Sequence, residues 1–233
     1  TACAWDSVIP LEDMWRELRR VTKPRGAIVL LGLTQPFTSV VVCSNRAMFK
    51  YTWVWEKDNG SNFLNTPYQP LKVHEDIAVF SSAASSYSKQ GPMNYTPQMT
   101  KGKPYKTTSG ASGLMDYHVS PRGYPTDNNG TRYPRSVLRF KSDKGLHPTQ
   151  KPLALLEYLV KTYTNEGDIV LDFAFGSGTT GAACGNLNRR FIGIERSPLP
   201  DRPTHPKDNP DYFNPAAARI AAAYAPLAAM EAR

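Results

Sequence analysis

The sequence predicts an α/β fold, a doubly wound and mostly parallel sheet with helices on both faces. Short apolar runs at residues 27–32 and 169–173 alternate with segments of helical periodicity, and continuous apolar runs are typical of parallel strands covered on both sides. The exception is residues 81–140, which are rich in Gly, Ser, Thr, Pro and Asn and show no sustained period. They predict an irregular insertion.

Five elements are expected before the insertion. Residues 10–22 predict a helix whose apolar face comprises Leu11, Met14, Trp15, Leu18 and Val21, and Pro24 and Gly26 end it. The next four are a strand at 27–32, a helix at 37–48, an alternating strand at 51–57 and a strand at 75–80.

Five more elements are expected after the insertion. They are helices at 151–164, 179–187 and 212–224, and strands at 169–173 and 191–195. The first of these helices follows His147-Pro-Thr-Gln-Lys-Pro152, where Thr149 or Gln150 can serve as the N-cap and Pro152 fits the first turn. A histidine at a helix start is most simply structural, so this motif gains meaning only beside the glycine loop described below.

Composition excludes several classes of protein. A chain of 233 residues with 40% hydrophobic residues can bury a core, and it contains no apolar run long enough to cross a bilayer. Its three cysteines, Cys3, Cys43 and Cys184, lack the spacing of a disulfide framework or a zinc site. We therefore expect a reducing, cytoplasmic compartment and no metal.

Most of the net charge of +8 lies in the insertion. Residues 81–140 hold two aspartates, six of the chain's 12 tyrosines and eight cations, which are Lys89, Lys101, Lys103, Lys106, Arg122, Arg132, Arg135 and Arg139. This gives the insertion a charge of +6. Cations that neutralise phosphates and aromatic rings that stack on bases suit a nucleic-acid surface. A surface insertion tied to the core by its tyrosines is the alternative from composition alone.

A glycine loop at 176–181 is the sharpest local motif. Gly176-Ser-Gly-Thr-Thr-Gly181 follows a strand, opens a helix and matches the dinucleotide fingerprint, and Glu195 follows Gly176 by 19 positions. Asp172, however, would repel the pyrophosphate of NAD, whereas it would attract an ammonium group. S-adenosylmethionine carries an ammonium, a sulfonium and a ribose, and no phosphate. The loop therefore favours S-adenosylmethionine over NAD, with Glu195 placed to accept from ribose hydroxyls.

Three motifs in order resemble the beta-class DNA amino-methyltransferases, which methylate adenine N6 or cytosine N4. They are residues 147–152, residues 171–181 and Phe191-Ile-Gly-Ile-Glu195, and Trp53-Val-Trp-Glu-Lys57 and His74-Glu-Asp76 extend the match. The resemblance implies a Rossmann-like methyltransferase fold with a truncated catalytic half at 1–80, a target-recognition insertion at 81–140 and a cofactor-binding half at 141–233, all in one structural domain. It also implies double-stranded DNA as the partner, contacted by the eight cations of the insertion.

The resemblance also assigns cofactor-binding residues. Those expected to hold the methionine end of S-adenosylmethionine are Thr149, Gln150, Lys151, Asp172, Phe173, Ala174, Phe175, Gly176, Ser177, Gly178, Thr179 and Thr180, and Glu195 is expected to hold the ribose. Phe175 stands where the family often has a smaller residue. A homodimer is left open, and no membrane contact is expected.

The family's catalytic tetrapeptide, Asp/Asn/Ser-Pro-Pro-aromatic, is not found in the sequence. By resemblance it would precede Thr1, together with its strand, so we expect no catalytic residue here and no methylation by this chain alone. Asn209-Pro-Asp-Tyr212 lacks the second proline and follows no apolar strand. The resemblance across the first half of the chain favours adenine N6 over cytosine N4 as the methylated atom. Trp53 and Trp55 are candidates for the base pocket or for the core. A non-catalytic remnant that binds DNA and cofactor is the alternative to an enzyme.

Overall fold

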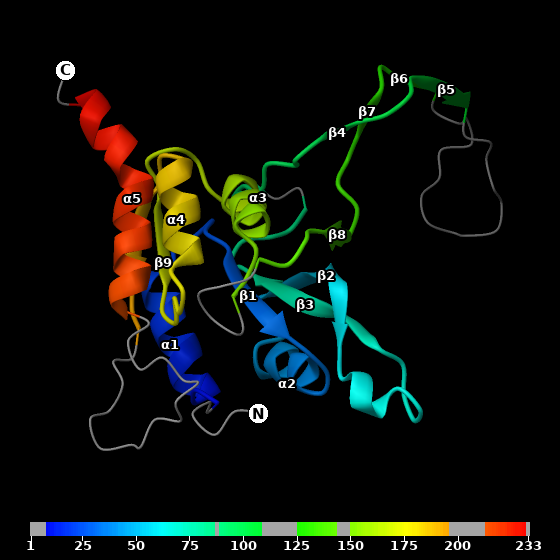
Figure 1. The fold of residues 1–233 in the computed structure, drawn as a ribbon. Coiled ribbons are helices and arrows are strands. Elements are labelled where there is room, and N and C mark those ends of the chain that lie inside the picture. The colour runs from blue at the N-terminus through cyan, green and yellow to red at the C-terminus, as the bar shows by residue number, and fades with distance from the viewer. Residues whose placement is uncertain (1–7, 87–88, 109–124, 144–149, 196–212, 232–233) are drawn as a thin grey trace. The chain divides into compact units, whose positions relative to one another are not determined.

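The computed structural model of the protein describes residues 8–86, 89–108, 125–143, 150–195 and 213–231 (Figure 1). The chain divides into two compact units. The larger unit combines Thr1–Thr96 with Ser136–Arg233, and the smaller unit is Pro97–Arg135. The smaller unit lies within the predicted insertion, whose two ends belong to the larger unit.

The larger unit contains all ten elements that the sequence predicts. In chain order its elements are α1 (Leu11–Val21), β1 (Ile28–Leu33), α2 (Phe37–Ser44), β2 (Phe49–Ser61), the 3-10 helix η1 (Phe63–Asn65), β3 (Lys72–Phe80), β8 (Val137–Arg139), α3 (Leu153–Tyr163), β9 (Ile169–Asp172), α4 (Thr179–Asn186), β10 (Arg190–Gly193) and α5 (Phe213–Glu231). Helix α2 is shorter than expected and ends before Asn45, whose φ of −148° is not helical. Asparagine readily leaves a helix because its side chain competes for backbone hydrogen bonds.

The main sheet is mixed, which differs from the mostly parallel sheet that we expect from the sequence. Its strand order is β1-β3-β2-β8. Strand β3 runs antiparallel to both β1 and β2, and only β8 runs parallel to its neighbour. Residues 62–71 join β2 to β3, and so short a connection allows antiparallel pairing but no crossover. Strands β9 and β10 form a separate parallel pair.

Helices pack on both faces of the main sheet, as the sequence predicts. Ile77 and Val79 of β3 belong to one core cluster with residues of α3 and α4. Ala78 and Phe80 belong to a second cluster with residues of α1 and α2. This alternation follows from the two-residue period of a strand. The sheet therefore separates a face that carries α1 and α2 from a face that carries α3 and α4.

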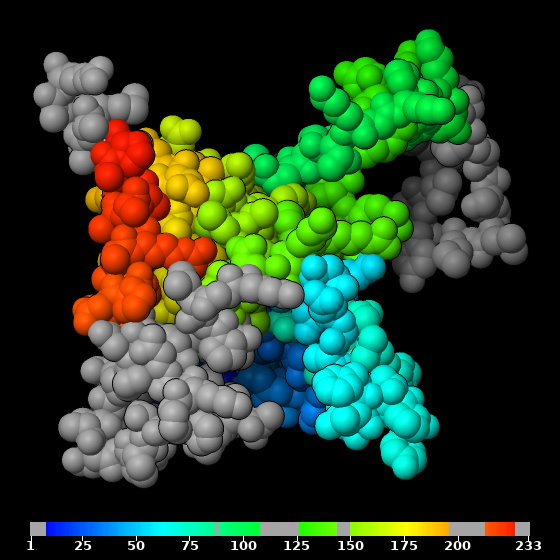
Figure 2. All heavy atoms as spheres, in the orientation of Figure 1, coloured from blue at the N-terminus to red at the C-terminus, as the bar shows by residue number. Residues whose placement is uncertain are grey.

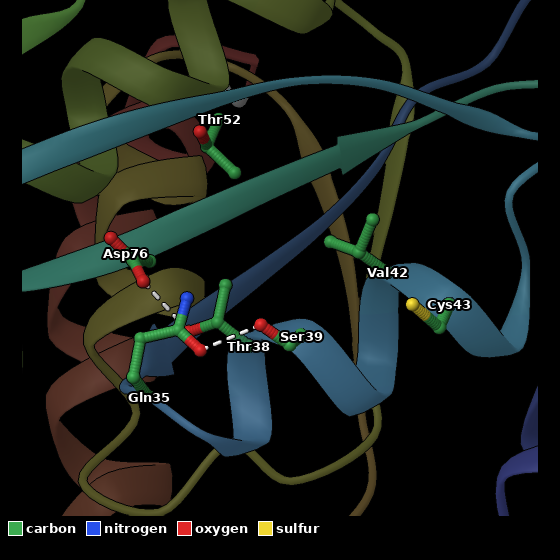
Figure 3. Close-up of a pocket in the computed structure, with 7 residues that line it drawn as sticks. All are labelled: Gln35, Thr38, Ser39, Val42, Cys43, Thr52 and Asp76. Carbon is green, nitrogen blue, oxygen red and sulfur yellow. Dashed lines mark hydrogen bonds between the residues drawn. The ribbon is translucent and has the colours of Figure 1, made fainter.

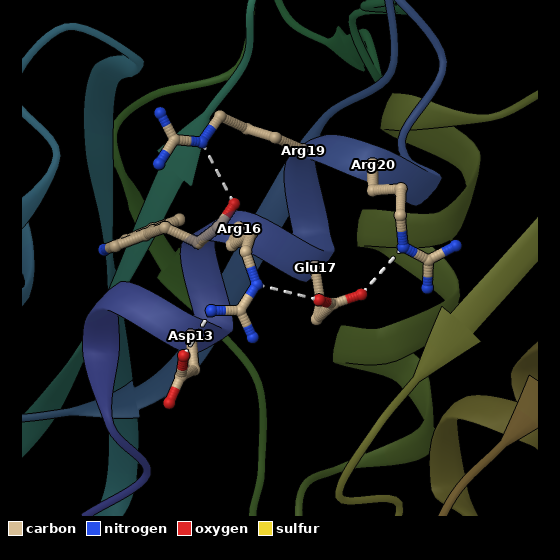
Figure 4. A network of polar contacts seen from close by, with 6 residues as sticks. Asp13, Arg16, Glu17, Arg19 and Arg20 are labelled. Carbon is tan, nitrogen blue, oxygen red and sulfur yellow. Dashed lines mark hydrogen bonds and ion pairs between the residues drawn. The ribbon is translucent and has the colours of Figure 1, made fainter.

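Helix α1 shows the expected division between a buried and a charged face. Trp15 and Leu18 are buried. On the outer face the guanidinium of Arg16 bonds Asp13 and Glu17, and Arg20 donates to Glu17 at 2.7 Å (Figure 4). Exposed ion pairs of this kind contribute at most about 1 kcal/mol each. The buried apolar face therefore holds the helix in place.

The connection between β2 and β3 lies on the molecular surface, where Figure 2 shows it in cyan. Phe63, Leu64 and Tyr68 are 70%, 78% and 89% exposed. The sequence from Asn59 to Leu71 contains no charged side chain. Neighbouring exposed apolar side chains often mark contact surfaces.

The smaller unit is built from two short antiparallel ladders. Strand β4 (Thr100–Lys101) pairs with β7 (Thr131–Arg132), and β5 (Tyr105–Thr108) pairs with β6 (Pro125–Asn128). Strands of two to four residues are too short to produce a visible alternation in the sequence. The same reason explains why β8, a strand of the main sheet, falls inside the segment predicted to be irregular.

Candidate functional site

The glycine loop joins the end of β9 at Asp172 to the start of α4 at Thr179. Gly176 and Gly178 have φ angles of +51° and +71°, which residues other than glycine rarely adopt. A Cβ on Gly178 would also lie 3.0 Å from the carbonyl oxygen of Ala216 on α5. The second glycine is therefore required by both its backbone conformation and its neighbour.

Both oxygens of the Asp172 carboxylate hold the loop. One accepts from the backbone N–H of Ala174 at 3.1 Å, and the other accepts from the hydroxyl of Thr180 at 2.6 Å. These bonds join the end of β9 to the first turn of α4. The acidic group that the sequence singles out therefore lies at the loop and also orders it.

Glu195 is a second carboxylate that bonds the loop. One of its carboxylate oxygens accepts from the backbone N–H of Gly176 at 2.6 Å. The parallel pairing of β9 with β10 brings this about, because Gly193 pairs with Asp172 and the next residues continue beside the loop. The structure thus brings together Asp172, Gly176, Thr180 and Glu195, which the sequence assigns to one site.

The other loop residues are largely buried. Phe175 is 8% exposed, and its ring centroid lies 6.3 Å from that of Phe191 and 5.8 Å from that of Phe213. Ser177 and Thr179 are also buried, with their hydroxyl oxygens 3.1 Å apart. Phe173 packs against the cluster that contains Leu33 at the end of β1.

Sequence reasoning missed Arg219, which reaches the loop from α5. Its guanidinium donates to the carbonyl of Ser177 at 3.2 Å and to the hydroxyl of Thr179 at 2.8 Å. Burial lowers the pKa of Arg219 below its usual value. The only available signal was an arginine amid the alanines of the last helix, and that pattern does not reveal which loop the side chain contacts.

The segment before α3 is tied down by acidic residues that the sequence did not assign to the site. Lys151 Nζ donates to Glu75 Oε2 at 2.8 Å. The backbone N–H of Leu153, the first residue of α3, donates to Asp143 Oδ2 at 2.8 Å. Asp143 therefore caps α3, and the expectation of a cap from Thr149 or Gln150 is wrong for this N–H group. Thr149 and His147 lie outside the described residues, and Gln150 is half-buried.

Trp53 and Trp55 are core residues rather than pocket linings. They are 4% and 3% exposed and belong to the cluster on the α3 side of the sheet. Trp53 Nε1 donates to the hydroxyl of Tyr163 at 2.6 Å, and Trp55 Nε1 donates to the carbonyl of Phe140 at 2.9 Å. The structure supports the core-packing alternative for both.

Arg132, predicted to contact DNA, joins the strands of the smaller unit. Its guanidinium donates to Asn128 Oδ1 at 2.5 Å, to the carbonyl of Thr131 at 2.9 Å and to the carbonyl of Lys103. It also lies 4.6 Å from the centroid of the Tyr105 ring. A guanidinium group has five N–H donors, and these three hydrogen bonds use three of them.

The other predicted DNA contacts are distributed over both units. Lys101, Lys103, Lys106 and Arg135 are exposed in the smaller unit, and Lys89 and Arg139 are exposed in the larger unit. Two of them have acidic partners, since Lys106 pairs with Asp127 at 2.8 Å and Arg139 with Glu56 at 2.8 Å. Arg122 lies outside the described residues.

A separate hollow of about 300 Å³ lies between α2 and the main sheet (Figure 3). It is lined by Gln35, Thr38, Ser39, Val42, Cys43, Thr52 and Asp76. Thr38 Oγ1 donates to Asp76 Oδ2 at 2.7 Å, and Ser39 Oγ donates to Gln35 Oε1 at 2.7 Å. None of the predicted cofactor-binding residues lines this hollow.

Two features are absent from the part of the chain that the structure describes. No helix there combines the length and apolar character that a membrane span needs. Within the same ranges, no three His, Cys, Asp or Glu side chains gather as a metal site would require. Cys43 and Cys184 are free thiols, one exposed and one buried.

Comparison with known proteins identifies the family. The sequence pattern of the DNA methylase family, which comprises the N6-adenine and N4-cytosine enzymes, matches residues 4–198. The chain belongs to this family. Its glycine loop, flanked by Asp172 and Glu195, therefore lies in the fold of a DNA methylase, and the predicted α/β class is confirmed.

Two curated DNA methylases show the relationship at the level of sequence. The chain is 32% identical over 193 residues to the DNA adenine methyltransferase YhdJ of Escherichia coli K12, covering 79% of this chain and 61% of that protein. It is 30% identical over 182 residues to the type II methyltransferase M.HpaI of Haemophilus parainfluenzae, covering 77% and 52%. The chain thus spans less than two thirds of the length of either relative.

Solved structures agree with this assignment. The M1.HpyAVI–SAM complex superposes with a TM-score of 0.56 at 26% identity, covering 90% of this chain and 81% of that one. The cytosine-N4-specific PvuII DNA methyltransferase also gives 0.56, at 14% identity and with coverage of 96% and 80%. The second likeness concerns the fold alone.

Proposed function

We propose that this protein is an S-adenosylmethionine-dependent DNA amino-methyltransferase that prefers adenine N6 to cytosine N4. The observation that carries the proposal is the pair of carboxylates, Asp172 and Glu195, that both hydrogen-bond one glycine loop. Carboxylates attract an ammonium group and accept from ribose hydroxyls, but they repel a pyrophosphate. The chemistry of these residues therefore fits S-adenosylmethionine better than NAD.

Each residue then has a defined part in binding. Asp172 and the loop from Phe173 to Thr180 take the methionine end, together with the segment that includes Lys151, and Glu195 takes the ribose. When bound, S-adenosylmethionine supplies an electrophilic methyl group on a sulfonium cation. Glu195 accepts from Gly176 and can also accept from a ribose hydroxyl, because a carboxylate offers about four acceptor sites.

The DNA side of the proposal rests on the exposed cations. Lys101, Lys103 and Arg135 lie on the smaller unit, and Lys89 lies on the larger unit. We propose that they neutralise phosphates of double-stranded DNA, whose target base is flipped out of the duplex. The likeness to YhdJ supports adenine as the target, and the likeness to M.HpaI supports a role in restriction–modification. Such DNA lies inside the cell, where the free thiols of Cys43 and Cys184 would stay reduced.

The 233-residue chain offers a direct test. Calorimetry should show S-adenosylmethionine binding at least tenfold more tightly than NAD, which corresponds to about 1.4 kcal/mol. The sequence contains no Pro-Pro pair, so the family's tetrapeptide is not within these residues, and we expect binding without methyl transfer. Tighter binding of NAD would contradict the cofactor assignment, and transfer of labelled methyl groups to duplex DNA by this chain would contradict the expected inactivity.

We also propose an alternative function, motivated by the absence of a Pro-Pro pair within these 233 residues. In it the protein binds DNA and cofactor without catalysis. The two proposals make different predictions for methyl transfer to DNA by the protein purified from its own cells. Methylation of a DNA duplex by that material would eliminate the second function, whereas cofactor and DNA binding without any turnover would favour it.

A further inference from the structure

Glu75 connects two lysines that are distant from each other in sequence. Its Oε1 accepts from Lys57 Nζ at 3.2 Å, and its Oε2 accepts from Lys151 Nζ at 2.8 Å. The side chains of Lys57, Glu75 and Lys151 are only 13%, 15% and 23% exposed. The carboxylate of Glu75 therefore bonds the ammonium groups of both Lys57 and Lys151. Its single negative charge balances only one of their two positive charges.

The strand pairing explains how these residues meet. Glu75 on β3 pairs with Trp55 on β2, and Lys57 lies two residues beyond Trp55, on the same face of the strand. Lys151 approaches from the segment before α3, and its Nζ lies 5.7 Å from the centroid of the Trp55 ring. The cluster is thus built on the face of the sheet that carries α3.

Lys151 also lies against the end of β1. A Cβ placed on Gly32, whose φ is +76°, would lie 3.3 Å from Lys151 Nζ. Leu33, the last residue of β1, belongs to the cluster against which Phe173 of the glycine loop packs. The ion pair with Glu75 therefore fixes Lys151 beside Gly32, near the end of β1.

We propose that Glu75 is a positioning residue for the cofactor site, because it holds Lys151 and the segment leading into α3 against the end of β1. This inference rests on the proposed function, in which Lys151 closes over the methionine end of S-adenosylmethionine. Lys57 belongs to the paired strand β2, whereas Lys151 lies in neither helix nor strand. If the carboxylate is lost, the two ammonium groups repel each other, and Lys151 is the side chain that moves.

Burial and charge act in opposite directions on Glu75. Burial raises the pKa of its carboxyl group, but Lys151 and then Lys57 outweigh burial, so the pKa lies below its usual value. The carboxylate is therefore ionised at neutral pH, when both lysines are charged. A Glu75→Gln substitution keeps the size of the side chain and removes only its charge.

The test compares four proteins by calorimetry with S-adenosylmethionine: wild type, Glu75→Gln, the double variant Glu75→Gln with Lys57→Met, and Glu157→Gln as a matched control. Glu157 lies on α3 and accepts from Asn186 at 2.7 Å. We expect Glu75→Gln to weaken binding about tenfold, the value of a charge-assisted hydrogen bond. The double variant should recover most of this loss because only one ammonium group remains, and the control should bind like the wild type.

Acetylation of lysines, followed by mass spectrometry, separates positioning from stability. The rate at Lys151 relative to Lys161, an exposed lysine on α3, should rise severalfold in Glu75→Gln well below its melting temperature. S-adenosylmethionine should protect Lys151 in the wild type and not in this variant. A merely structural role would lower the melting temperature and leave the ratio unchanged, which would overturn the inference.

The outcomes for the two proposals are distinguishable. A wild-type chain that binds no S-adenosylmethionine contradicts the proposed function. If the wild type binds it and Glu75→Gln binds it equally well, the role of Glu75 is wrong and the proposed function stands.

Discussion

The carboxylate of Glu195 accepts a hydrogen bond at 2.6 Å from the backbone N–H of Gly176, a residue 19 positions earlier in the chain. Asp172 bonds Ala174 and Thr180, so two carboxylates hydrogen-bond the same glycine loop. The parallel register of β9 and β10 brings them to it.

Asp172→Asn should weaken binding of S-adenosylmethionine by about tenfold or more, because a charge-assisted bond to the ammonium group is lost. The amide oxygen can accept from only one of the two loop donors, Ala174 N–H or the Thr180 hydroxyl, so the melting temperature should fall as well. Calorimetry with 5′-methylthioadenosine, which has no amino-acid part, supplies the control ligand, and its affinity should not change. Equal losses for both ligands would show that Asp172 acts only through the loop.

Arg219→Ala should loosen the glycine loop from α5. It removes two hydrogen bonds to partly buried acceptors, so we expect the free energy of unfolding to fall by about 1–3 kcal/mol. Affinity for S-adenosylmethionine should fall as well, and Arg219→Lys should lie between the two. Arg16→Ala on the exposed face of α1 is the matched control. Faster hydrogen exchange at Gly178 in Arg219→Ala alone would localise the effect, and unchanged exchange there would refute it.

Arg132→Glu and Arg135→Glu should have different consequences. Arg132 bonds Asn128, Thr131 and Lys103, so its reversal should make the smaller unit sensitive to proteolysis. Arg135 is exposed, so its reversal should weaken duplex binding and reduce the slope of log affinity against log salt by about one. Salt titrations of duplex affinity measure the second effect. An unchanged slope for Arg135→Glu would remove this residue from the DNA surface.

Cys184 should make the protein less stable in alkali. Burial is the main cause that raises the pKa of its thiol from 9.0 to about 12, so the unfolded state releases the proton first. The contribution of the buried thiol to the free energy of unfolding is complete below pH 9 and declines as the pH rises through 9 toward 12. Unfolding by urea at pH 8 and at pH 10 should show the loss, and Cys184→Ala should reduce it. At pH 8 an alkylating reagent should modify the exposed Cys43 and spare Cys184.

The glycine loop and its two acidic residues were predictable from the sequence because β9, the loop, α4 and β10 are consecutive. Spacing along the chain then translates directly into neighbours in space. Arg219 and Glu75 were not predictable as site residues, since they reach the loop and Lys151 across 40 and 76 positions. The partners of Trp53 and Trp55 were not predictable for the same reason. Alternation along β2 predicts that the two side chains share a face of the strand, but it does not predict that they bond Tyr163 and Phe140.

The sequence by itself determined the α/β class, ten of the twelve described elements of the larger unit, the glycine loop and the family resemblance, because each depends on residues that are close along the chain. The tertiary structure decided the mixed sheet, the cap of α3 by Asp143, the internal role of Arg132 and the ion-pair cluster around Glu75. These depend on which strands pair and on which charged groups are buried together. Residues distant in sequence become neighbours only when the core forms.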